Sequence, residues 1–576
     1  MKKFIGLFLL AAFATVLIAC DNTDLTTTGG SNTTTIDVTS IVSDTGLDPN
    51  VEGIVDIVLW SGSGATYYDL GHQDLTADDL PAQNDAAAYA VAKAFNAIYP
   101  NVTINGYFRS GGPDGWSQVL ETYRDDNGRF PAVWASRFLS DDVEKGLVAD
   151  LSRFEDDPLY QMLNPSIMKM MNYYGFQAGL PQYILPWGMY VNKTLADEQG
   201  IVMPGPDWDI DEYTEFVSNY STETDNLYFG AMDVPLRLIE SGTNTITEQL
   251  HNYDGGDSFI DLNSTEVRGM IHYLHDWAGS SFWGLYDIET ETLGAELAAA
   301  SGPLHQLNTT LGWDYNFFRE GYLLTLEYEP WMMGDCADPD GSAPCIMDDW
   351  DIYPRPATDY NDNTIGVVLD PMAVYNYCID DGDLACSAEE ELKIQIAYTF
   401  AIFWCADNRS FYERSEQMYS TTDTESGEVY YSSALNDSFP AVTGEMFDFQ
   451  MDYWYKPAKH QRFNAVNNDG DYLMPGFQEV VRIYNASQHW EVSDKSFPWQ
   501  YSSGGQTLFI LNEWLNYYNP DINGGVSRDD AAFESTILSL LPTWNQLVNE
   551  RWASQFESLQ ESLTMYYGFT EDDFSN

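Results

Sequence analysis

Apolar and polar positions follow two different periods along the first part of the chain. Residues 54–60 form a short apolar run, which predicts a buried strand. Residues 84–99 place apolar side chains three and four apart and predict a helix, whereas residues 101–108 alternate and predict a second strand. A helix, a strand and a helix are expected to follow over residues 114–125, 131–136 and 141–147. Because strands joined by helix-length connections pair in parallel, the pattern predicts an α/β fold with a mainly parallel sheet covered on both faces.

The same alternation of strands and helices continues to the end of the chain. Further elements are expected at residues 188–201 (strand, then helix), 205–220 (helix), 321–333 (strand), 364–375 (strand), 389–406 (helix) and 506–566 (two or three helices). In open α/β sheets, ligands bind at the carboxyl ends of the strands. Trp60 and Trp134 stand at such ends, so the first strand's exit loop, residues 61–68, is a predicted wall of a cleft.

The N-terminal residues indicate export. Lys2 and Lys3 precede an apolar run that is too short for a comfortable membrane span, which is the order of a secretion signal over residues 1–20. The run ends at Cys20 and resembles a bacterial lipobox, which implies that the cysteine is lipidated; a plain secretion signal or an uncleaved anchor is the alternative. Residues 21–50 are rich in Thr, Gly and Ser and are expected to form a flexible tether.

The charge balance excludes one class of partner. Of the charged residues, 25 are basic and 89 acidic, so the net charge is −64, and removing the signal with its two lysines leaves −66. Nucleic acid is not expected as a partner, because its phosphates must be neutralised by Lys and Arg. The acidity is interpreted as a source of solubility or an adaptation to salt, with a cationic ligand or bound calcium as the rival interpretation.

Five cysteines follow the one that ends the signal. Cys336 and Cys345 stand nine positions apart and Cys378 and Cys386 eight, which in an exported protein predicts two local disulfides and leaves Cys405 free. Cross-pairing between the two sets and full reduction remain open alternatives.

Six local patterns occur together in one order. The first strand ends in Trp, and it is followed by "AFNAIYPNVTINGYF" (94–108), "RFPAVWASRFLSDDVEKGLVADLSRF" (129–154), "LPQYILPWGMYVNKTLADEQGI" (180–201), "GPDWDIDEYTEFV" (205–217) and "YLLTLEYEPWMM" (322–333). In this order the chain resembles the extracellular solute-binding proteins of ABC importers, in the carbohydrate-binding group that includes the maltose-binding proteins. It departs from the family's usual residues at Ala132 and Val191, and residues 410–500 have no clear counterpart.

The resemblance implies a two-lobe fold of the periplasmic-binding-protein type with the ligand between the lobes. One lobe would comprise residues 51–185 plus 366–470, and the other 190–362 plus 475–576. The implied function is a lipid-anchored binding protein outside the cytoplasmic membrane that delivers a carbohydrate, expected to be an oligosaccharide, to an ABC permease. It would be a monomer without catalytic activity, cofactor or metal. The alternatives are an exported carbohydrate-active enzyme, or the same fold binding a non-sugar solute such as a polyamine.

A sugar-binding site needs flat aromatic surfaces for the sugar's C–H faces and short polar side chains for its hydroxyls. By resemblance, Trp134 and Trp331 are expected to stack on the sugar, Glu329 to assist Trp331, and Arg137 to occupy the place of a hydroxyl-binding Asp. The remaining candidates come from loops and crossings near the expected cleft: Trp60, Ser61, Ser63, Asp114, Trp116, Trp187, Trp499 and Tyr501. With 17 Trp in the chain, most must be ordinary core or surface residues.

Other chemistry is poorly supported by the sequence. His272 and His275 are three apart on an expected helix, but no acid or Cys stands at ligand spacing. Residues 338–341 and 467–471 resemble calcium loops only loosely and fit turns better. The sequence contains no HExxH, P-loop or GxSxG motif, so no catalytic residue is assigned.

Overall fold

The computed structural model describes most of the chain's first 220 residues and several later segments, all within the unit Thr39–Asn576. The described residues are 41–110, 113–220, 263–265, 268, 318, 321, 323–328, 349–357, 364–379, 385–422, 429–435, 439–455, 474–486, 488–491 and 533–575.

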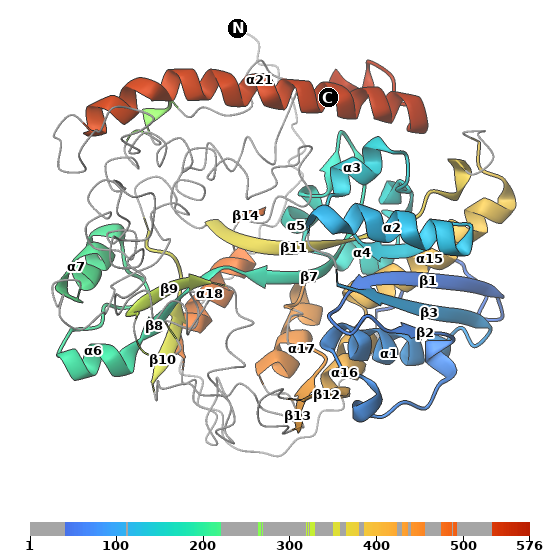
Figure 1. The fold of residues 1–576 in the computed structure, drawn as a ribbon, viewed down its shortest axis with the longest axis horizontal. Helices are drawn as coiled ribbons and strands as arrows, with labels where there is room; N and C mark the ends of the chain where they lie inside the picture. The colour runs from blue at the N-terminus through green and yellow to red at the C-terminus, as the bar shows by residue number, and fades with distance from the viewer. Residues whose placement is uncertain are drawn as a thin grey trace, which may run out of the picture. The chain divides into compact units, whose positions relative to one another are not determined.

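The larger sheet has seven strands, which Figure 1 shows in blue, green and yellow except for β14, which is orange. Its order is β14-β11-β4-β1-β3-β2, and β7 also pairs with β11. These strands are β1 (Gly53–Trp60), β2 (Thr66–Tyr67), β3 (Val102–Arg109), β4 (Val133–Ala135), β7 (Leu180–Pro186), β11 (Thr364–Val374) and β14 (Gln488–Glu491).

The central strands confirm the predicted parallel arrangement, because β4, β1 and β3 run parallel side by side. The pairs β3–β2, β4–β11 and β11–β7 are antiparallel. The sheet is therefore mixed, with parallel strands at its centre and antiparallel pairs beside them.

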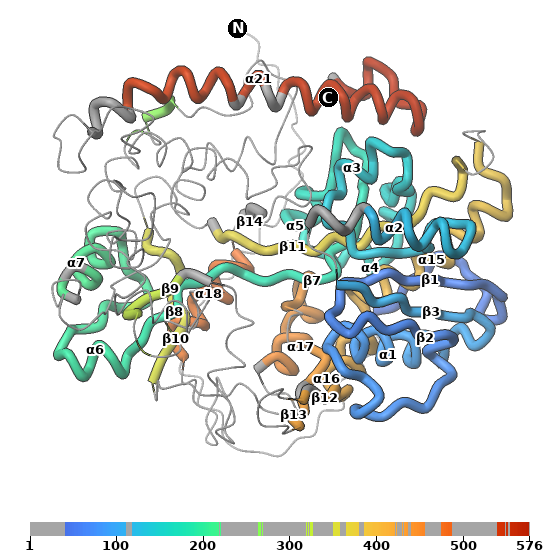
Figure 2. Tube along the Cα trace, in the orientation of Figure 1, coloured from blue at the N-terminus to red at the C-terminus, as the bar shows by residue number. Residues whose placement is uncertain are grey.

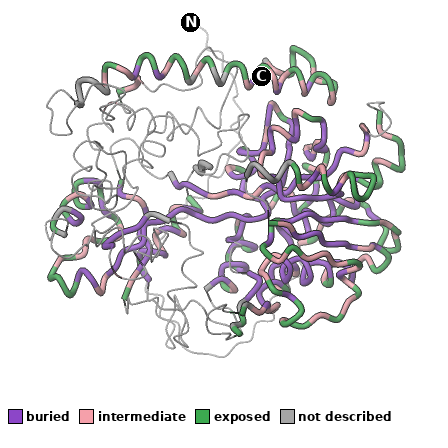
Figure 3. Tube along the Cα trace, in the orientation of Figure 1, coloured by how far each residue is buried: buried purple, intermediate pink, exposed green. Residues whose placement is uncertain are grey.

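Helices cover both faces of the parallel strands, as the sequence predicts. On one face lie α1 (Gln83–Asn96) and α15 (Ala388–Ala406), where Phe95 packs edge-on against Phe400 and Phe403. On the other face lies α2 (Pro113–Asn127), whose Tyr123 ring centroid is 4.7 Å from that of Tyr107 on β3. Figure 3 shows β1 and β3 as buried between these layers.

A smaller sheet follows directly on the larger one. Strand β8 (Gly188–Asn192) begins two residues after β7 ends and is the middle strand of an antiparallel sheet with β9 (Thr325–Tyr328) and β10 (Trp350–Tyr353). Two helices, α6 (Lys193–Gln199) and α7 (Ile210–Tyr220), follow β8. The chain therefore changes sheet at Trp187, between residues 185 and 190, where the sequence predicts that it passes from one lobe to the other.

The other elements are α3 (Leu139–Glu144), α4 (Pro158–Met162), α5 (Pro165–Lys169), β5 (Asn172–Tyr173), β6 (Phe176–Gln177), α16 (Asn408–Glu416), β12 (Met418–Thr422), β13 (Val429–Ser433), α17 (Gly444–Tyr455), α18 (Pro475–Ala486) and α21 (Phe533–Tyr567), with short 3-10 turns between them.

The last long helix, α21, packs against α3 and its neighbours. The C-terminal part of α21, red in Figure 2, contacts α3, since Ser558 donates to Glu144 and Gln560 donates to Tyr174. Its Phe556 also lies buried against this region. The C-terminal part of this helix therefore contacts residues of the predicted first lobe, and the lobe to which the helix belongs stays a prediction. The remaining lobe boundaries stay a prediction. None of the described helices is long and apolar enough to cross a bilayer.

One predicted disulfide lies within the described residues and is confirmed. Cys378 and Cys386 are bonded to each other, and Cys405 is a free, buried thiol whose pKa is raised by burial, as expected for a core residue. Among the described residues, the one group of three potential metal ligands combines this pair with Glu391, and its two sulfurs are already joined in the disulfide.

Candidate functional site

The carboxyl ends of the parallel strands bring an aromatic and a cationic side chain together. Trp60 is the last residue of β1 and pairs in register with Arg109, the last residue of β3. Because partners in a parallel ladder point to the same face, both side chains project on the side covered by α2. Trp60 is 44% exposed, although the five residues before it, 55–59, are buried. An exposed indole at this edge is available to a ligand.

The backbone at Trp60 is fixed from two sides. The amide of Ser61 donates to the carbonyl of Arg109 at 3.0 Å, which extends the ladder by one residue. Asn84, in the first turn of α1, donates through Nδ2 to the carbonyl of Trp60 at 2.5 Å. The Oδ1 of Asn84 in turn accepts from the hydroxyl of Tyr183 on β7 at 2.5 Å. Trp60 is thus connected to the strand that leads to the smaller sheet.

A buried carboxylate shapes the loop after Trp60. Asp85, which has no exposed surface, accepts from the hydroxyls of Ser61 and Ser63 at 2.7 Å each and from Tyr67 at 3.2 Å. Burial raises the pKa of Asp85, while these three donors act in the opposite direction by stabilising the charged form. Ser61 and Ser63 therefore serve as anchors of the loop, and their hydroxyls point to Asp85 in this structure.

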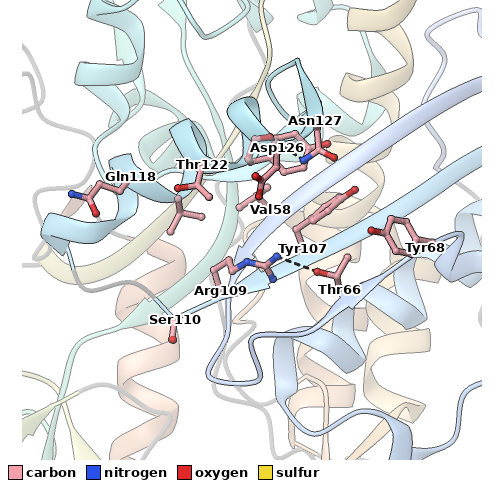
Figure 4. A pocket seen from close by; sticks show the side chains of 12 residues that line it. Val58, Thr66, Tyr68, Tyr107, Arg109, Ser110, Gln118, Thr122, Asp126 and Asn127 are labelled. Carbon is pink, nitrogen blue, oxygen red and sulfur yellow. Dashed lines mark hydrogen bonds between the residues drawn. The ribbon is translucent and has the colours of Figure 1, made fainter.

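A pocket of about 670 Å³ opens between α2 and the strands β1, β2 and β3. Figure 4 shows its lining side chains coming from the sheet on one side and from the helix on the other. They are Val58, Thr66, Tyr68, Tyr107, Arg109, Ser110, Gln118, Val119, Thr122, Tyr123, Asp126 and Asn127. The volume lies in the usual range of small-molecule sites. The lining includes the strand partner of Trp60, so the pocket adjoins the exposed indole.

The structure places Trp134 in the core. Its ring has no exposed surface, and its Nε1 donates at 2.9 Å to Asp142 on α3. Ser136 donates to the same carboxylate, whose pKa is raised by burial to about 6. This conformation offers no face of Trp134 to a sugar, because α3 closes over the end of β4.

Two other predicted site residues are described. Arg137 follows β4 and is half-buried, and among the described residues it makes no hydrogen bond or ion pair. Trp187 is 7% exposed and packs with Val368 on β11, apart from the main core cluster. Its amide donates to Gly366 at 2.7 Å. Trp187 therefore belongs to the crossing between the sheets, where it was expected.

The remaining predicted site and cysteine residues have side chains that lie outside the described part of the structure. Asp114 and Trp116 lie in α2, but their side chains are outside the described part of the structure. Also outside it are Cys20, Glu329, Trp331, Cys336, Cys345, Trp499 and Tyr501. Their roles stay predictions.

Several residues of the edge were not expected from the sequence. Asn84 lies in the first turn of α1, which begins at Gln83, and its side chain donates to the carbonyl of Trp60. Asp85 and Arg109 were not singled out at all. Asp85 could have been identified from the sequence. It is an acidic residue in the first turn of the helix that follows the Ser-containing loop after the first strand, and such a residue is well placed to accept hydrogen bonds from that loop. Arg109 could not have been identified in this way, because its position beside Trp60 depends on the register between β1 and β3.

Known proteins resemble this chain only at the level of structure. No protein-family model and no curated protein matches it. A candidate oligosaccharide periplasmic-binding protein from Synechococcus is 12% identical and has a TM-score of 0.51, over 86% of this chain and 100% of that chain. A sugar transporter protein from Rhizobium etli, in an open conformation, is 14% identical with a TM-score of 0.50, over 86% and 99%. A periplasmic solute-binding protein from Pectobacterium atrosepticum is 13% identical with a TM-score of 0.50, over 87% and 99%.

These similarities establish the fold. The chain has the α/β, two-lobe fold of the periplasmic solute-binding proteins, which confirms the predicted fold class. They cover nearly the whole of each similar chain, so the match is not confined to one sheet.

Proposed function

We propose that this chain is a lipid-anchored substrate-binding protein, outside the cytoplasmic membrane, that captures a carbohydrate and delivers it to an ABC import permease. The observation that carries the proposal is the exposed indole of Trp60 at the carboxyl edge of three parallel strands. Two of the similar structures are described as an oligosaccharide-binding and a sugar transporter protein, which supports a sugar as the ligand here.

A fixed aromatic surface suits this task. The C–H face of a sugar packs on a flat ring, and a ring that is held before binding loses little freedom on binding. The backbone of Trp60 is held by Asn84 and by the Ser61 amide, and the following loop is held by Asp85. The free protein thus already presents the platform in a defined position.

The cellular setting of the proposal rests on the sequence. Lipidation at Cys20 would anchor the protein to the outer face of the membrane, and residues 21–50 would let it reach the permease. The net charge of −64 argues against a nucleic-acid partner. The protein is proposed to act as a monomer that binds its ligand without covalent change.

Ligand screening followed by calorimetry tests the proposal. The full mature chain is screened by thermal shift against neutral oligosaccharides and polyamines, because a ligand that binds only the folded state raises the melting temperature. The affinity for the best sugar is then compared between the unmodified protein, Trp60→Ala and Tyr431→Ala. Tyr431 is a matched control, since it is 48% exposed on β13 and lines no part of the described pocket.

We expect Trp60→Ala to weaken sugar binding about tenfold or more, as loss of a stacked aromatic costs roughly 1 kcal/mol beyond the apolar area it buries. Tyr431→Ala should bind like the unmodified protein. A polyamine that raises the melting temperature while no sugar does would favour a non-sugar solute. Shortened saccharides after incubation with the protein would instead identify an enzyme.

A further inference from the structure

The pocket beside Trp60 has the chemistry of a sugar subsite. Its aromatic wall is formed by Tyr68, which is 62% exposed, and by Tyr107, whose ring meets that of Tyr68 edge-on at 6.2 Å. Tyr107 is itself supported by Tyr123 from α2. This network of perpendicular rings fixes Tyr107 while leaving the ring of Tyr68 open to the solvent.

The polar wall contains a held donor. The guanidinium of Arg109 donates to the carbonyls of Ala65 and Phe108 at 2.9 and 2.7 Å, and to the hydroxyl of Thr66 at 3.1 Å. Figure 4 shows the contact with Thr66 as a dashed line. These bonds to neutral groups fix the guanidinium without cancelling its charge. Among the described residues, no carboxylate forms an ion pair with it.

An acceptor faces the pocket from the opposite wall. Asp126 belongs to α2, whereas Arg109 belongs to β3, and both line the pocket without pairing with each other. A hydroxyl can donate to a carboxylate and accept from a guanidinium at once. Gln118 and Thr122, also exposed on α2, add groups that both donate and accept. A lining of this kind matches a polyol better than an anion or a cation, because it carries one charge of each sign.

We propose that this pocket binds one unit of a neutral oligosaccharide whose neighbouring unit lies on Trp60. The proposal rests on the proposed function and adds to it a second subsite, which only ligands of two or more units fill. Trp60 and Arg109 are strand partners on the same face, so a chain stacked on the indole passes the mouth of the pocket. Tyr68 supplies the platform there, and Asp126 and Arg109 bind the hydroxyls.

Calorimetry with saccharides of increasing length tests the second subsite. The probes are α-glucans, β-glucans, xylans and mannans of two to six units together with their single-unit monosaccharides, titrated into the full mature chain. The variants are Tyr68→Ala and Asp126→Asn, both at exposed positions. Asp125→Asn is the matched control, because Asp125 is the exposed neighbour that pairs with Arg124 and does not line the pocket.

For the series that binds, affinity should rise with length until the pocket is filled. Tyr68→Ala and Asp126→Asn should each remove about five- to tenfold of the affinity for the longer chains, the worth of one aromatic contact or one charged hydrogen bond. The shortest ligand and the Asp125→Asn variant should show no change.

Two results would overturn the subsite while leaving sugar binding intact. One is an affinity that both variants leave unaltered at every length. The other is an equal loss at every length, which would make the pocket part of a single-unit site. If no saccharide binds the unmodified protein, the proposed function fails as well, so the two failures are distinguished.

Discussion

Asp85 is the residue on which the shape of the loop after Trp60 depends most directly. It is fully buried in the first turn of α1 and accepts three hydroxyl hydrogen bonds from that loop. Asp85→Ala removes the carboxylate that accepts all three of these hydrogen bonds. The loop spans residues 61–67, so the change acts on the segment that follows the proposed platform without touching the platform itself.

The loss of stability in Asp85→Ala depends on which of the three hydroxyl donors can form a hydrogen bond to water instead. The hydroxyl of Ser61 is 1% exposed, and leaving a buried hydroxyl without its acceptor costs about 1–3 kcal/mol. Ser63 and Tyr67 are half-buried and can bond to water instead, so they add less. With the small cavity left by the carboxylate, we expect Asp85→Ala to destabilise the protein by about 2–3 kcal/mol. Asp85→Asn keeps the shape and one acceptor and should cost less, since it also removes a charge whose burial raises the pKa of Asp85.

Hydrogen exchange and calorimetry would measure the effect. Asp85→Ala should speed amide exchange in residues 61–67 and weaken sugar binding, and Asp85→Asn should do so to a smaller degree. Asp74→Ala is the control, because the Asp74 side chain is fully exposed and makes only a 3.8 Å contact with Lys93. Unchanged exchange in this loop in Asp85→Ala would refute the reasoning, because it would mean that the loop keeps its shape without the carboxylate.

Two further changes test the packing around the site. Asp351 is buried and accepts hydrogen bonds from the Gly476 and Phe477 amides at the start of α18. Burial raises its pKa from 3.8 to about 6. The unmodified protein should therefore lose stability, on the order of 3 kcal/mol, as pH rises from about 4 to 6. Asp351→Asn should lack this slope, and urea unfolding at several pH values checks it; parallel pH profiles would contradict the assignment. Replacing Cys378 and Cys386 by Ser opens a loop closed by a disulfide with a sequence separation of 8. The change should lower the free energy of unfolding by about 2–3 kcal/mol, which thermal unfolding measures. An unchanged melting temperature would show that the disulfide does not stabilise this region.

The fold was predictable from the sequence where the pattern was local. The apolar run of β1 and the spacing in α1 place both elements within one to three residues of their observed ends. The packing of α21 was not predictable, because nothing in its own sequence tells which apolar surface its apolar side meets. The antiparallel strand β2 is two residues long and was missed for lack of any period.

For the candidate site, the sequence predicted where Trp60 lies but not its surroundings. Trp60 ends β1 as expected, because a strand's carboxyl end can be identified from sequence, and its role in binding stays a prediction. Trp134 also lies near the carboxyl end of a strand, β4, yet it is buried and bonded to Asp142 of α3. The sequence does not reveal this burial, because it depends on how α3 packs against β4. The bond between Tyr183 and Asn84 joins residues 99 positions apart, which no local pattern reveals.

Calorimetric titration of the mature protein and of Trp60→Ala with neutral oligosaccharides tests the central claim most directly. The account predicts saturable binding to the unmodified protein and an affinity at least about tenfold lower for Trp60→Ala, with an equal melting temperature for the two free proteins. Undiminished binding by Trp60→Ala, or no binding of any oligosaccharide by the unmodified protein, would contradict it.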